Sequence, residues 1–462
     1  MASSTAGSTT TAARGRRVDA LRARSAPLAG AALPLLDRSS PSARRWYLLG
    51  ALLASIAAYL RLPPGAAGSI WAEDGTRFLT DQLVIGWPAS TTEPYAGYMH
   101  LVPRLAALVA GEVPPRWADD VFAVLASLVV GVCAAATFAL ARGHLPSPVV
   151  RGLLASMVVL LPTAGLEAAG NTANSHWFLM ATAFWALTSR PTSRSGAALA
   201  AGVVVLAMGS DPLTAILAPL VLARVVLLRG LRDHVVTAAF VLSSAVQALV
   251  VLGTDRGPGD PTPATGEVLA AYLTRVPYTL MTGLGRAASL FEQHGWLVVV
   301  AALVPFGVAG ALALLVDART RWVALTAAPA SVVFFVVPAA VSWSDRFDPF
   351  AFGVDPNPSS RYSVVPMLLL LAVAAAGLQA ALDRFPRPLA GALLALVLVL
   401  GAVTVLPSFR PEAATRVGPL WDAGVLAAAQ ECRADPSLVS ARVQIAPDRP
   451  NWVVDLPCTS LR

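Results

Sequence analysis

Two adjacent carboxylates, Glu73 and Asp74, stand beside Trp71 in the stretch SIWAEDGTRFLTDQL, just after the first apolar segment of the chain. A carboxylate that is partly desolvated next to an apolar ring has a raised pKa and can take a proton from a hydroxyl group. We assign Asp74 as the general base and Glu73 as its helper or as a metal ligand. In a plainer interpretation, Asp74 and Gly75 only form a turn, with Asp74 capping a helix over 76–84.

Ring-bearing side chains near this pair offer flat faces and hydrogen bonds to a sugar. The candidates are Trp71, Tyr95, Tyr98 and His100. Tryptophan and tyrosine also concentrate at the headgroup level of a bilayer, so anchoring to the interface is the alternative role for these side chains.

Two arginines in a later polar segment, Arg346 and Arg361, are candidates for binding a phosphate group. A guanidinium group binds phosphate through two parallel hydrogen bonds. The alternative is that both arginines only form ion pairs with the nearby acids Asp345, Asp348 and Asp355 in a solvated loop.

A second set of polar side chains lies in LEAAGNTANSHWFLM, residues 166–180. Glu167, Asn171 and Asn174 are spaced i, i+4 and i+7, which would place them on one face of a helix. His176 lies off that face. Polar groups that enter a membrane span are costly, so they either bind substrate, such as an acceptor sugar, or hold neighbouring helices together.

The whole chain has the composition of a membrane protein. Its 462 residues are 56% hydrophobic and only 13% charged, and its mean hydropathy is +0.64. A soluble domain carries about a quarter charged residues. The Leu, Ala and Val runs are continuous rather than alternating, which favours spanning helices over a barrel. We predict an all-α polytopic membrane protein with about 11 transmembrane helices.

The distribution of arginines predicts how these helices are oriented. The expected spans are 46–62, 117–141, 148–166, 174–189, 195–209, 212–229, 234–253, 296–316, 322–342, 362–382 and 388–407. Alternate loops carry arginine, namely Arg142, Arg190, Arg194, Arg229, Arg232, Arg319, Arg321, Arg384 and Arg387. The short loops near 167–173 and 210–211 carry none. The positive-inside rule then predicts a cytoplasmic N-terminus and an extracytoplasmic C-terminus. Whether 195–209 and 212–229 both cross is open.

The same distribution excludes nucleic acid as a partner. The net charge is +7, but the basic residues are all arginines, many of them in the N-terminal tail and the short loops. No basic stripe alternates with aromatic residues in a soluble domain, as nucleic-acid binding would require. The lipid bilayer is the expected partner.

The chain divides into three parts on this basis. Residues 1–45 are rich in Ser, Thr, Ala and Arg and are expected to be a disordered cytoplasmic tail. Residues 46–407 form the transmembrane bundle, with extracytoplasmic loops at 63–116, 254–295 and 343–361. Within the first loop, 98–112 is too short to span and can lie at the interface. Residues 408–462 form an extracytoplasmic tail module.

Cysteine positions agree with this orientation. Cys432 and Cys458 both fall in the tail module, where a disulfide between them is expected because exported domains use such cross-links. Free thiols would instead indicate a cytosolic tail and reverse the topology. Cys133 lies within a span and is expected to be a packing residue. The module is predicted to contain a helix and two strands, at 419–431, 441–446 and 451–456.

These features together resemble the GT-C superfamily of integral-membrane glycosyltransferases, which use polyprenyl-phosphate sugars. The resemblance covers the architecture of most of the chain. It consists of the Glu73-Asp74 pair at the start of a long first external loop, the surface segment 98–112 in that loop, and about 11 spans with an external C-terminal domain. Composition without lysine resembles that of high-GC bacteria, as in actinobacteria.

The resemblance implies a function. In that family the acidic motif supplies the catalytic base and sometimes a metal ligand, so a divalent cation at Glu73 and Asp74 is the one cofactor to consider. The implied donor is a polyprenyl-phosphate sugar and the implied acceptor a cell-envelope glycan or glycolipid, with inversion at the anomeric carbon. The family usually has Asp-Glu or Asp-Asp, whereas this chain has Glu-Asp, which leaves open which residue is the base.

Two other functions remain as alternatives. A lipid-linked oligosaccharide flippase or polysaccharide exporter would need polar residues through the depth of the bundle. The predicted spans are almost uncharged, with Arg224 as the main exception. A membrane O-acyltransferase would need a histidine and an asparagine buried in the middle of the bundle. His176 and Asn174 could fill this role, but they lie at the outer end of a predicted span.

Overall fold

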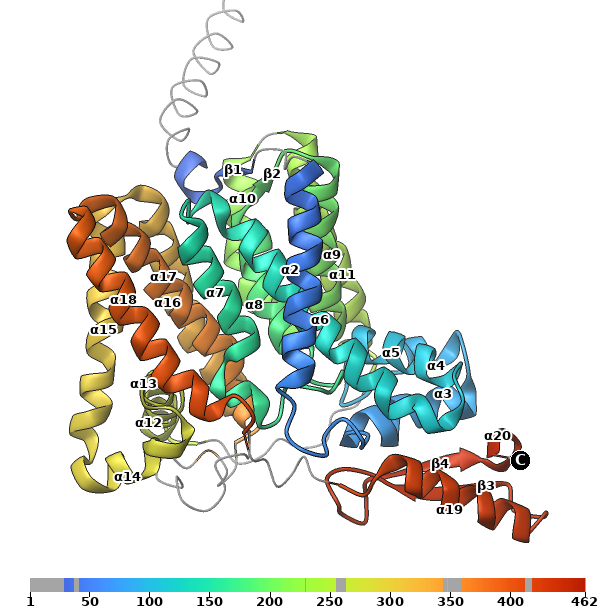
Figure 1. The fold of residues 1–462 in the computed structure, drawn as a ribbon. Helices are drawn as coiled ribbons and strands as arrows, with labels where there is room; N and C mark the ends of the chain where they lie inside the picture. Colours follow the sequence, from blue (N-terminus) through green and yellow to red (C-terminus); the bar gives the residue numbers. More distant parts are fainter. Residues whose placement is uncertain are drawn as a thin grey trace, which may run out of the picture.

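The protein is predominantly helical. A computed structural model describes residues 29–36, 41–228, 230–254, 263–343, 347, 359–411 and 418–461, and in it helices make up nearly all regular structure (Figure 1). In this described part, seven helical segments are long and apolar enough to cross a membrane. They are Pro115–Gly143, Pro148–Gly165, Val235–Leu252, Trp296–Val316, Ala318–Val341, Ser360–Arg384 and Arg387–Ser408. The expected total of about 11 spans therefore stays a prediction.

Two helices form the centre of the bundle. Every residue of α8 (His176–Thr188) is buried, and α17 (Val364–Arg384) is buried along most of its length. A helix that is apolar on all sides belongs inside a bundle. Around them lie α2 (Pro41–Leu60), α6 (Ala118–Leu140) and α7 (Pro148–Leu160).

The remaining long helices flank this centre on two sides (Figure 1). On one side lie α9 (Arg194–Ser210), α10 (Ala218–Leu227) and α11 (Val235–Leu252). On the other lie α15 (Trp296–Val316), α16 (Ala318–Val341) and α18 (Arg387–Val405). Helix α18 exposes Leu396, Leu398 and Leu400, as a helix facing lipid does, because lipid tails are as apolar as leucine.

Short helices cover one end of the bundle, which we call the site end. The first loop contains η1 (Asp74–Leu79), α3 (Thr80–Ile85), α4 (Ala89–Thr92) and α5 (Leu101–Gly111). Helix α5 corresponds to the surface segment expected at 98–112. The later segment α12 (Thr265–Leu273), η7 (Thr274–Tyr278), α13 (Thr279–Thr282) and α14 (Leu284–His294) lies at the same end (Figure 1).

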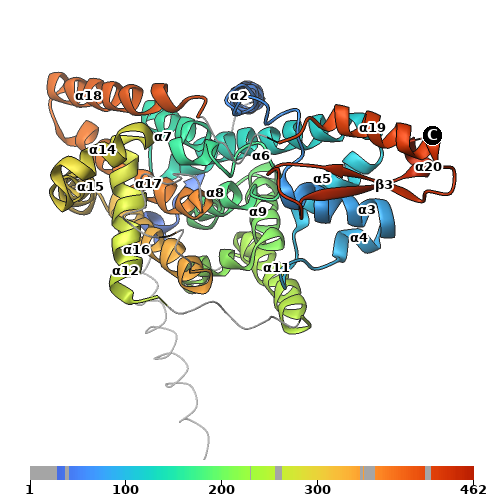
Figure 2. The ribbon, with the colours of Figure 1, turned by 90° about the horizontal axis from the view of Figure 1, so that it is seen from below.

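Residues 418–461 form a small module, the C-terminal module, beside the first loop (Figure 2). It contains α19 (Trp421–Ala434), β3 (Ser440–Gln444), β4 (Val453–Pro457) and α20 (Cys458–Leu461). Strands β3 and β4 pair antiparallel. Cys432 and Cys458 form the expected disulfide, which joins α19 to the start of α20.

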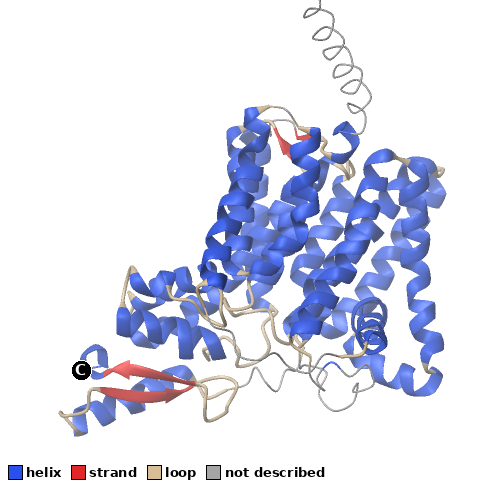
Figure 3. Cartoon of the chain, turned by 180° about the vertical axis from the view of Figure 1, so that it is seen from behind, coloured by secondary structure: helices blue, strands red, loops and turns tan. Residues whose placement is uncertain are grey.

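The N-terminal segment departs from the expectation of a disordered tail over 1–45. Its described residues 29–36 contain a helical turn and strand β1 (Leu35–Leu36), which pairs parallel with β2 (Arg190–Pro191). Ala32 and Leu33 are buried against Leu228, so the apolar stretch gains enough buried surface to fold back. This small sheet lies at the end opposite the C-terminal module (Figure 3). Residues 1–28 and 37–40 lie outside the described part.

Candidate functional site

A cavity of about 870 Å³ opens at the site end of the bundle. Four chain segments that are far apart in sequence line it. They are the first loop at residues 73–100, the turn leading into α8, the turn between α9 and α10, and the start of η9 (Ser360–Ser363). The end of α16 closes one side through Pro338 and Val341.

Glu73 is the acidic residue of the first loop that lines this cavity. Its Oε2 is buried and has no hydrogen-bond partner among the described residues. Burial raises the pKa of Glu73, and the positive charge of Arg361 opposes the rise. A carboxylate with an unused acceptor atom and a raised pKa can accept a proton from a bound hydroxyl group.

Asp74 is fully buried and is not among the residues that line the cavity. Its Oδ1 accepts hydrogen bonds from Thr172 Oγ1 at 2.6 Å and from Ala173 N at 2.8 Å, and its Oδ2 accepts one from Thr172 N at 2.8 Å. Burial raises the pKa of Asp74 to about 7, while the hydrogen bonds from Thr172 lower it. Asp74 thus ties the first loop to the turn before α8. No side-chain cap bond is present at the start of η1, so the helix-capping alternative is not realised either.

Arg361 lines the cavity and is held in place by Glu167. Its backbone N donates to Glu167 Oε2 at 3.1 Å, and its Nη1 forms an ion pair with Glu167 Oε1. Its guanidinium carbon lies 5.2 Å from the centre of the Tyr362 ring. Two residues that the sequence placed in separate groups, Glu167 and Arg361, therefore act as one unit. Arg346 and the acids Asp345, Asp348 and Asp355 lie outside the described residues.

The expected helical face of Glu167, Asn171 and Asn174 is wrong, because residues 166–175 form turns rather than a helix. Gly170 has a φ of +72°, which favours glycine and breaks a helix. Asn171 Nδ2 donates to Glu167 O at 2.7 Å, and its Oδ1 accepts from Asn174 N at 2.9 Å. These side chains replace the missing helical hydrogen bonds, and of the two asparagines Asn174 also lines the cavity.

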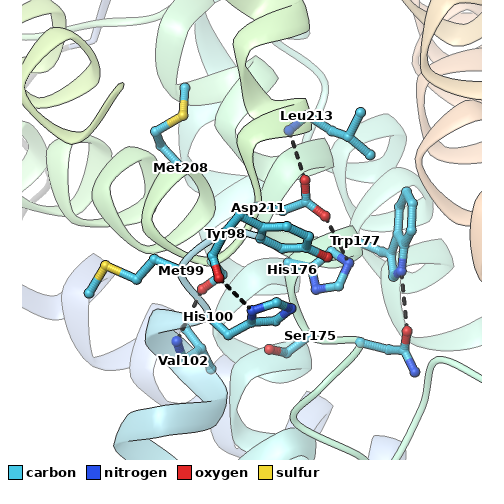
Figure 4. Close-up of polar contacts among 12 residues, drawn as sticks. Tyr98, Met99, His100, Val102, Ser175, His176, Trp177, Met208, Asp211 and Leu213 are labelled. Atoms are coloured by element: carbon cyan, nitrogen blue, oxygen red, sulfur yellow. Dashed lines mark hydrogen bonds and ion pairs between the residues drawn. The ribbon is translucent and has the colours of Figure 1, made fainter. Parts of the chain in front are cut away.

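His176 and Asp211 form a polar pair on the wall of the cavity (Figure 4). His176 Nε2 lies 3.3 Å from Asp211 Oδ2, and both side chains are buried. Asp211 Oδ1 also accepts a hydrogen bond from Leu213 N at 2.7 Å, which caps the short helix Pro212–Leu217. The second role of Asp211 could not be found from sequence, because no local signal relates it to a residue on another helix.

The aromatic candidates separate into two groups. Tyr95, Tyr98 and His100 line the cavity, and the rings of Tyr98 and His100 stack with their centres 4.2 Å apart. Burial lowers the pKa of His100 to about 3, so its ring is neutral at physiological pH. Trp71 does not line the cavity but packs in a buried cluster with the C-terminal module. Trp177 lines the cavity although the sequence did not single it out.

No family model matches the chain, and no curated protein is significantly similar to it in sequence. The geometry of this cavity is therefore the basis on which we infer a function.

The described residues do not favour a metal ion at the acidic pair. Glu73 faces the cavity while the carboxylate of Asp74 is occupied by Thr172 and Ala173, so the two groups do not converge on one point. Among the described ranges, no group of three or more His, Cys, Asp and Glu side chains is arranged to hold a metal ion. The nearest positive charge that acts on Glu73 is that of Arg361.

Proposed function

We propose that this protein is a membrane glycosyltransferase of the GT-C type. It transfers a sugar from a polyprenyl-phosphate carrier to an extracytoplasmic glycan or glycolipid. One observation carries the proposal: Glu73, which has an unpaired carboxylate oxygen, and Arg361 line the same cavity. Glycosyl transfer from a phosphate needs a base for the acceptor hydroxyl and a positive charge for the departing phosphate.

The reaction proceeds in one displacement. Glu73 removes the proton from the acceptor hydroxyl as its oxygen bonds to the anomeric carbon, and the bond from that carbon to the phosphate oxygen breaks with inversion. Arg361 stabilises the negative charge that the polyprenyl phosphate gains. Glu73 takes the role of base that the sequence assigned to Asp74, because the acceptor atoms of Asp74 are already used.

The cavity offers suitable surroundings for a sugar. The rings of Tyr95, Tyr98 and Trp177 border it, and such faces pack against the C–H groups of a sugar ring. The side chains of Asp211 and His176 add hydrogen-bonding groups for hydroxyls. A deep, mostly apolar pocket with a few convergent polar groups is the usual form of a small-molecule site.

We also propose that the protein lies in the bacterial plasma membrane with its N-terminus in the cytoplasm. The site end and the C-terminal module then face outward, where disulfides persist and donors carried on a lipid are available. Helices α2, α8, α9 and α10 complete about 11 crossings in this proposal. Their alignment with the seven candidate spans in Figure 1 supports that count.

The test is release of free polyprenyl phosphate from a panel of polyprenyl-phosphate sugars by the purified protein in lipid. We expect Glu73→Gln to lower the turnover number by about 10²–10⁴-fold, the usual contribution of a general base. Glu112→Gln is the matched control, since Glu112 is an exposed acid of the same loop. Undiminished turnover in Glu73→Gln would show that Glu73 is not the general base. If no donor in the panel releases polyprenyl phosphate, the protein is not a glycosyltransferase of this type.

The His176–Asp211 pair favours a second candidate, a membrane O-acyltransferase. A histidine oriented by a carboxylate is the usual arrangement of a base that activates a hydroxyl group. If the chain transfers acyl groups, Asp211→Asn should lower acyl-transfer turnover by orders of magnitude and Glu73→Gln should not. For the glycosyltransferase the expectation is reversed: Asp211→Asn should mainly raise the acceptor KM. A flippase or exporter has less support, because the buried arginines Arg61 and Arg224 donate to backbone carbonyls.

A further inference from the structure

The backbone that leads into Glu73 is hydrogen-bonded to the C-terminal module. Trp421 N donates to Gly68 O at 2.9 Å, Ala446 N donates to Ile70 O at 3.0 Å, and Ala72 N donates to Ala446 O at 2.5 Å. Trp71 and Ala446 form a parallel β-bridge. Residues 70–72 therefore run alongside the extension of strand β3, and Glu73 is the next residue of the chain.

Side-chain packing between the two segments is close. A Cβ atom placed on Gly75 would lie 2.5 Å from Ile445 Cδ1 and 2.8 Å from Val454 Cγ2. Real Cβ atoms do not approach other atoms so closely. A side chain at position 75 would therefore have to displace Ile445 or Val454 of the module. Ile70, Phe78, Ile445 and Val454 are all buried in the same apolar cluster.

A third contact holds the module against the end of the first loop. Trp421 is fully buried, and its Nε1 donates to Pro115 O at 2.7 Å. The module thus contacts the first loop before its short helices, at residues 68–72, and after them, at Pro115. Asp74 accepts hydrogen bonds from Thr172, in the turn before α8. The acidic pair is therefore fixed both by the module, through residues 68–72, and by the bundle, through Thr172.

The module itself depends on its cross-link. It is too small to bury a large core of its own, and domains of this size usually need a disulfide or a metal. The Cys432–Cys458 bond joins α19 to the start of α20 across 26 residues of sequence, and both cysteines are buried in the cluster that contains Ile70 and Phe78.

We propose that the C-terminal module is a positioning element of the site, which fixes Glu73 through the backbone of residues 68–72, and that the Cys432–Cys458 disulfide makes this positioning depend on an oxidising environment. The proposal rests on the proposed function only for what Glu73 does once positioned. Residues Ala446, Ile445 and Trp421 are then positioning residues, because each acts on the cavity through the first loop.

The test separates contact with the module from general damage. Gly75→Ala introduces a methyl group against Ile445 and Val454, and the triple variant Gly75→Ala, Ile445→Val, Val454→Ala makes room for it. Gly266→Ala is the control, since a Cβ on Gly266 meets nothing within 4 Å. Backbone hydrogen exchange is measured over residues 68–79 in the protein in lipid.

We expect exchange at Ala72 to rise at least tenfold in Gly75→Ala, to return toward the wild-type rate in the triple variant, and to stay unchanged in Gly266→Ala. Reduction of the disulfide should raise exchange in the same segment. Wild-type exchange in both Gly75→Ala and the reduced protein would overturn the proposal, since it would mean that the module does not hold residues 68–72.

A second measurement reports on Glu73 without any donor. The pH dependence of carbodiimide coupling at Glu73, read by mass spectrometry, follows the pKa of its carboxyl group. Loosening the loop admits water, so the midpoint should move to lower pH in Gly75→Ala and move back in the triple variant. An unchanged midpoint in Gly75→Ala would overturn the positioning role. If no donor is turned over by the wild-type protein, the proposed function fails, while exchange and coupling still decide the role of the module.

Discussion

Two neighbouring carboxylates perform different tasks at the site end of this protein. Glu73 lines the cavity and has one carboxylate oxygen without a partner among the described residues, whereas Asp74 is surrounded by donors from Thr172 and Ala173. Successive residues of a helical turn point about 100° apart, so adjacent side chains face different surroundings. The sequence identifies the pair as unusual, but it could not tell which member lines the cavity, because the donors to Asp74 come from a segment about a hundred residues away.

The first prediction concerns Asp74. In Asp74→Asn an amide NH2 group replaces one acceptor oxygen and faces the backbone donors of residues 172 and 173. Leaving a buried donor unsatisfied costs about 1–3 kcal/mol, so the free energy of unfolding should fall by that amount. Denaturant unfolding in detergent measures it, with Glu73→Gln as the comparison. A fully stable Asp74→Asn protein without activity would instead return the role of base to Asp74.

The second prediction is the pH dependence of turnover. The base must be ionised, so kcat/KM should rise with pH through the pKa of Glu73, which burial moves above the ordinary value of 4.5. The positive charge of Arg361 opposes that rise in pKa. Arg361→Gln should therefore move the rising part of the kcat/KM profile, the acid limb, to still higher pH, in addition to lowering the rate. A limb that stays in place in Arg361→Gln would mean that the titrating group is not Glu73.

At the scale of elements, continuous apolar runs predict helices well, because a membrane leaves the backbone few alternatives. The expected helix and strands of the C-terminal module agree with α19, β3 and β4 within a few residues at each end. The failure lies at 166–175, where polar residues with helical spacing form turns. Pro162 and Gly170 are the signals against a helix there, since proline and glycine interrupt helices and Gly170 adopts a positive φ.

The third prediction belongs to the junction of α8 and α10. Arg224 is fully buried and donates to Leu187 O at 3.0 Å, Ser189 O at 2.5 Å and Asp233 O at 2.9 Å. These are carbonyls at the end of α8 and in the short helix Leu231–His234 just before α11, so Arg224 of α10 holds these two segments together. Arg224→Met keeps the length of the side chain but removes the donors, which should lower the free energy of unfolding by about 2–4 kcal/mol.

Turnover in Arg224→Met distinguishes a structural role from transport. Arg224 does not line the cavity, so donor turnover per folded molecule should match the wild type while the midpoint of thermal unfolding falls. The opposite result, normal stability with lost function, would indicate that a charge inside the bundle serves a transported substrate and would favour the exporter.

At the scale of the whole molecule, the meeting of the first loop with the C-terminal module could not be predicted from sequence. Ala72 and Ala446 are hydrogen-bonded although almost the entire bundle separates them in the chain. Local propensity describes each segment alone. The contact between the two segments depends on where the chain leaves its last predicted span and how the module that follows then packs. The disulfide was predictable for a different reason: it follows from the redox compartment that the arginine distribution implies.

The last prediction tests that compartment. In a Cys133→Ser background, a membrane-impermeant maleimide added to intact cells after reduction should label Cys432 and Cys458. Ser195→Cys, an exposed position at the opposite end of the bundle, should react only after the membrane is permeabilised. Because nucleotide-sugars are confined to the cytoplasm, an outward-facing cavity requires a donor that carries its activating phosphate on a lipid. Labelling of residue 195 alone in intact cells would reverse the topology, turn Glu73 and Arg361 toward the cytoplasm, and remove the reason for a lipid-linked donor.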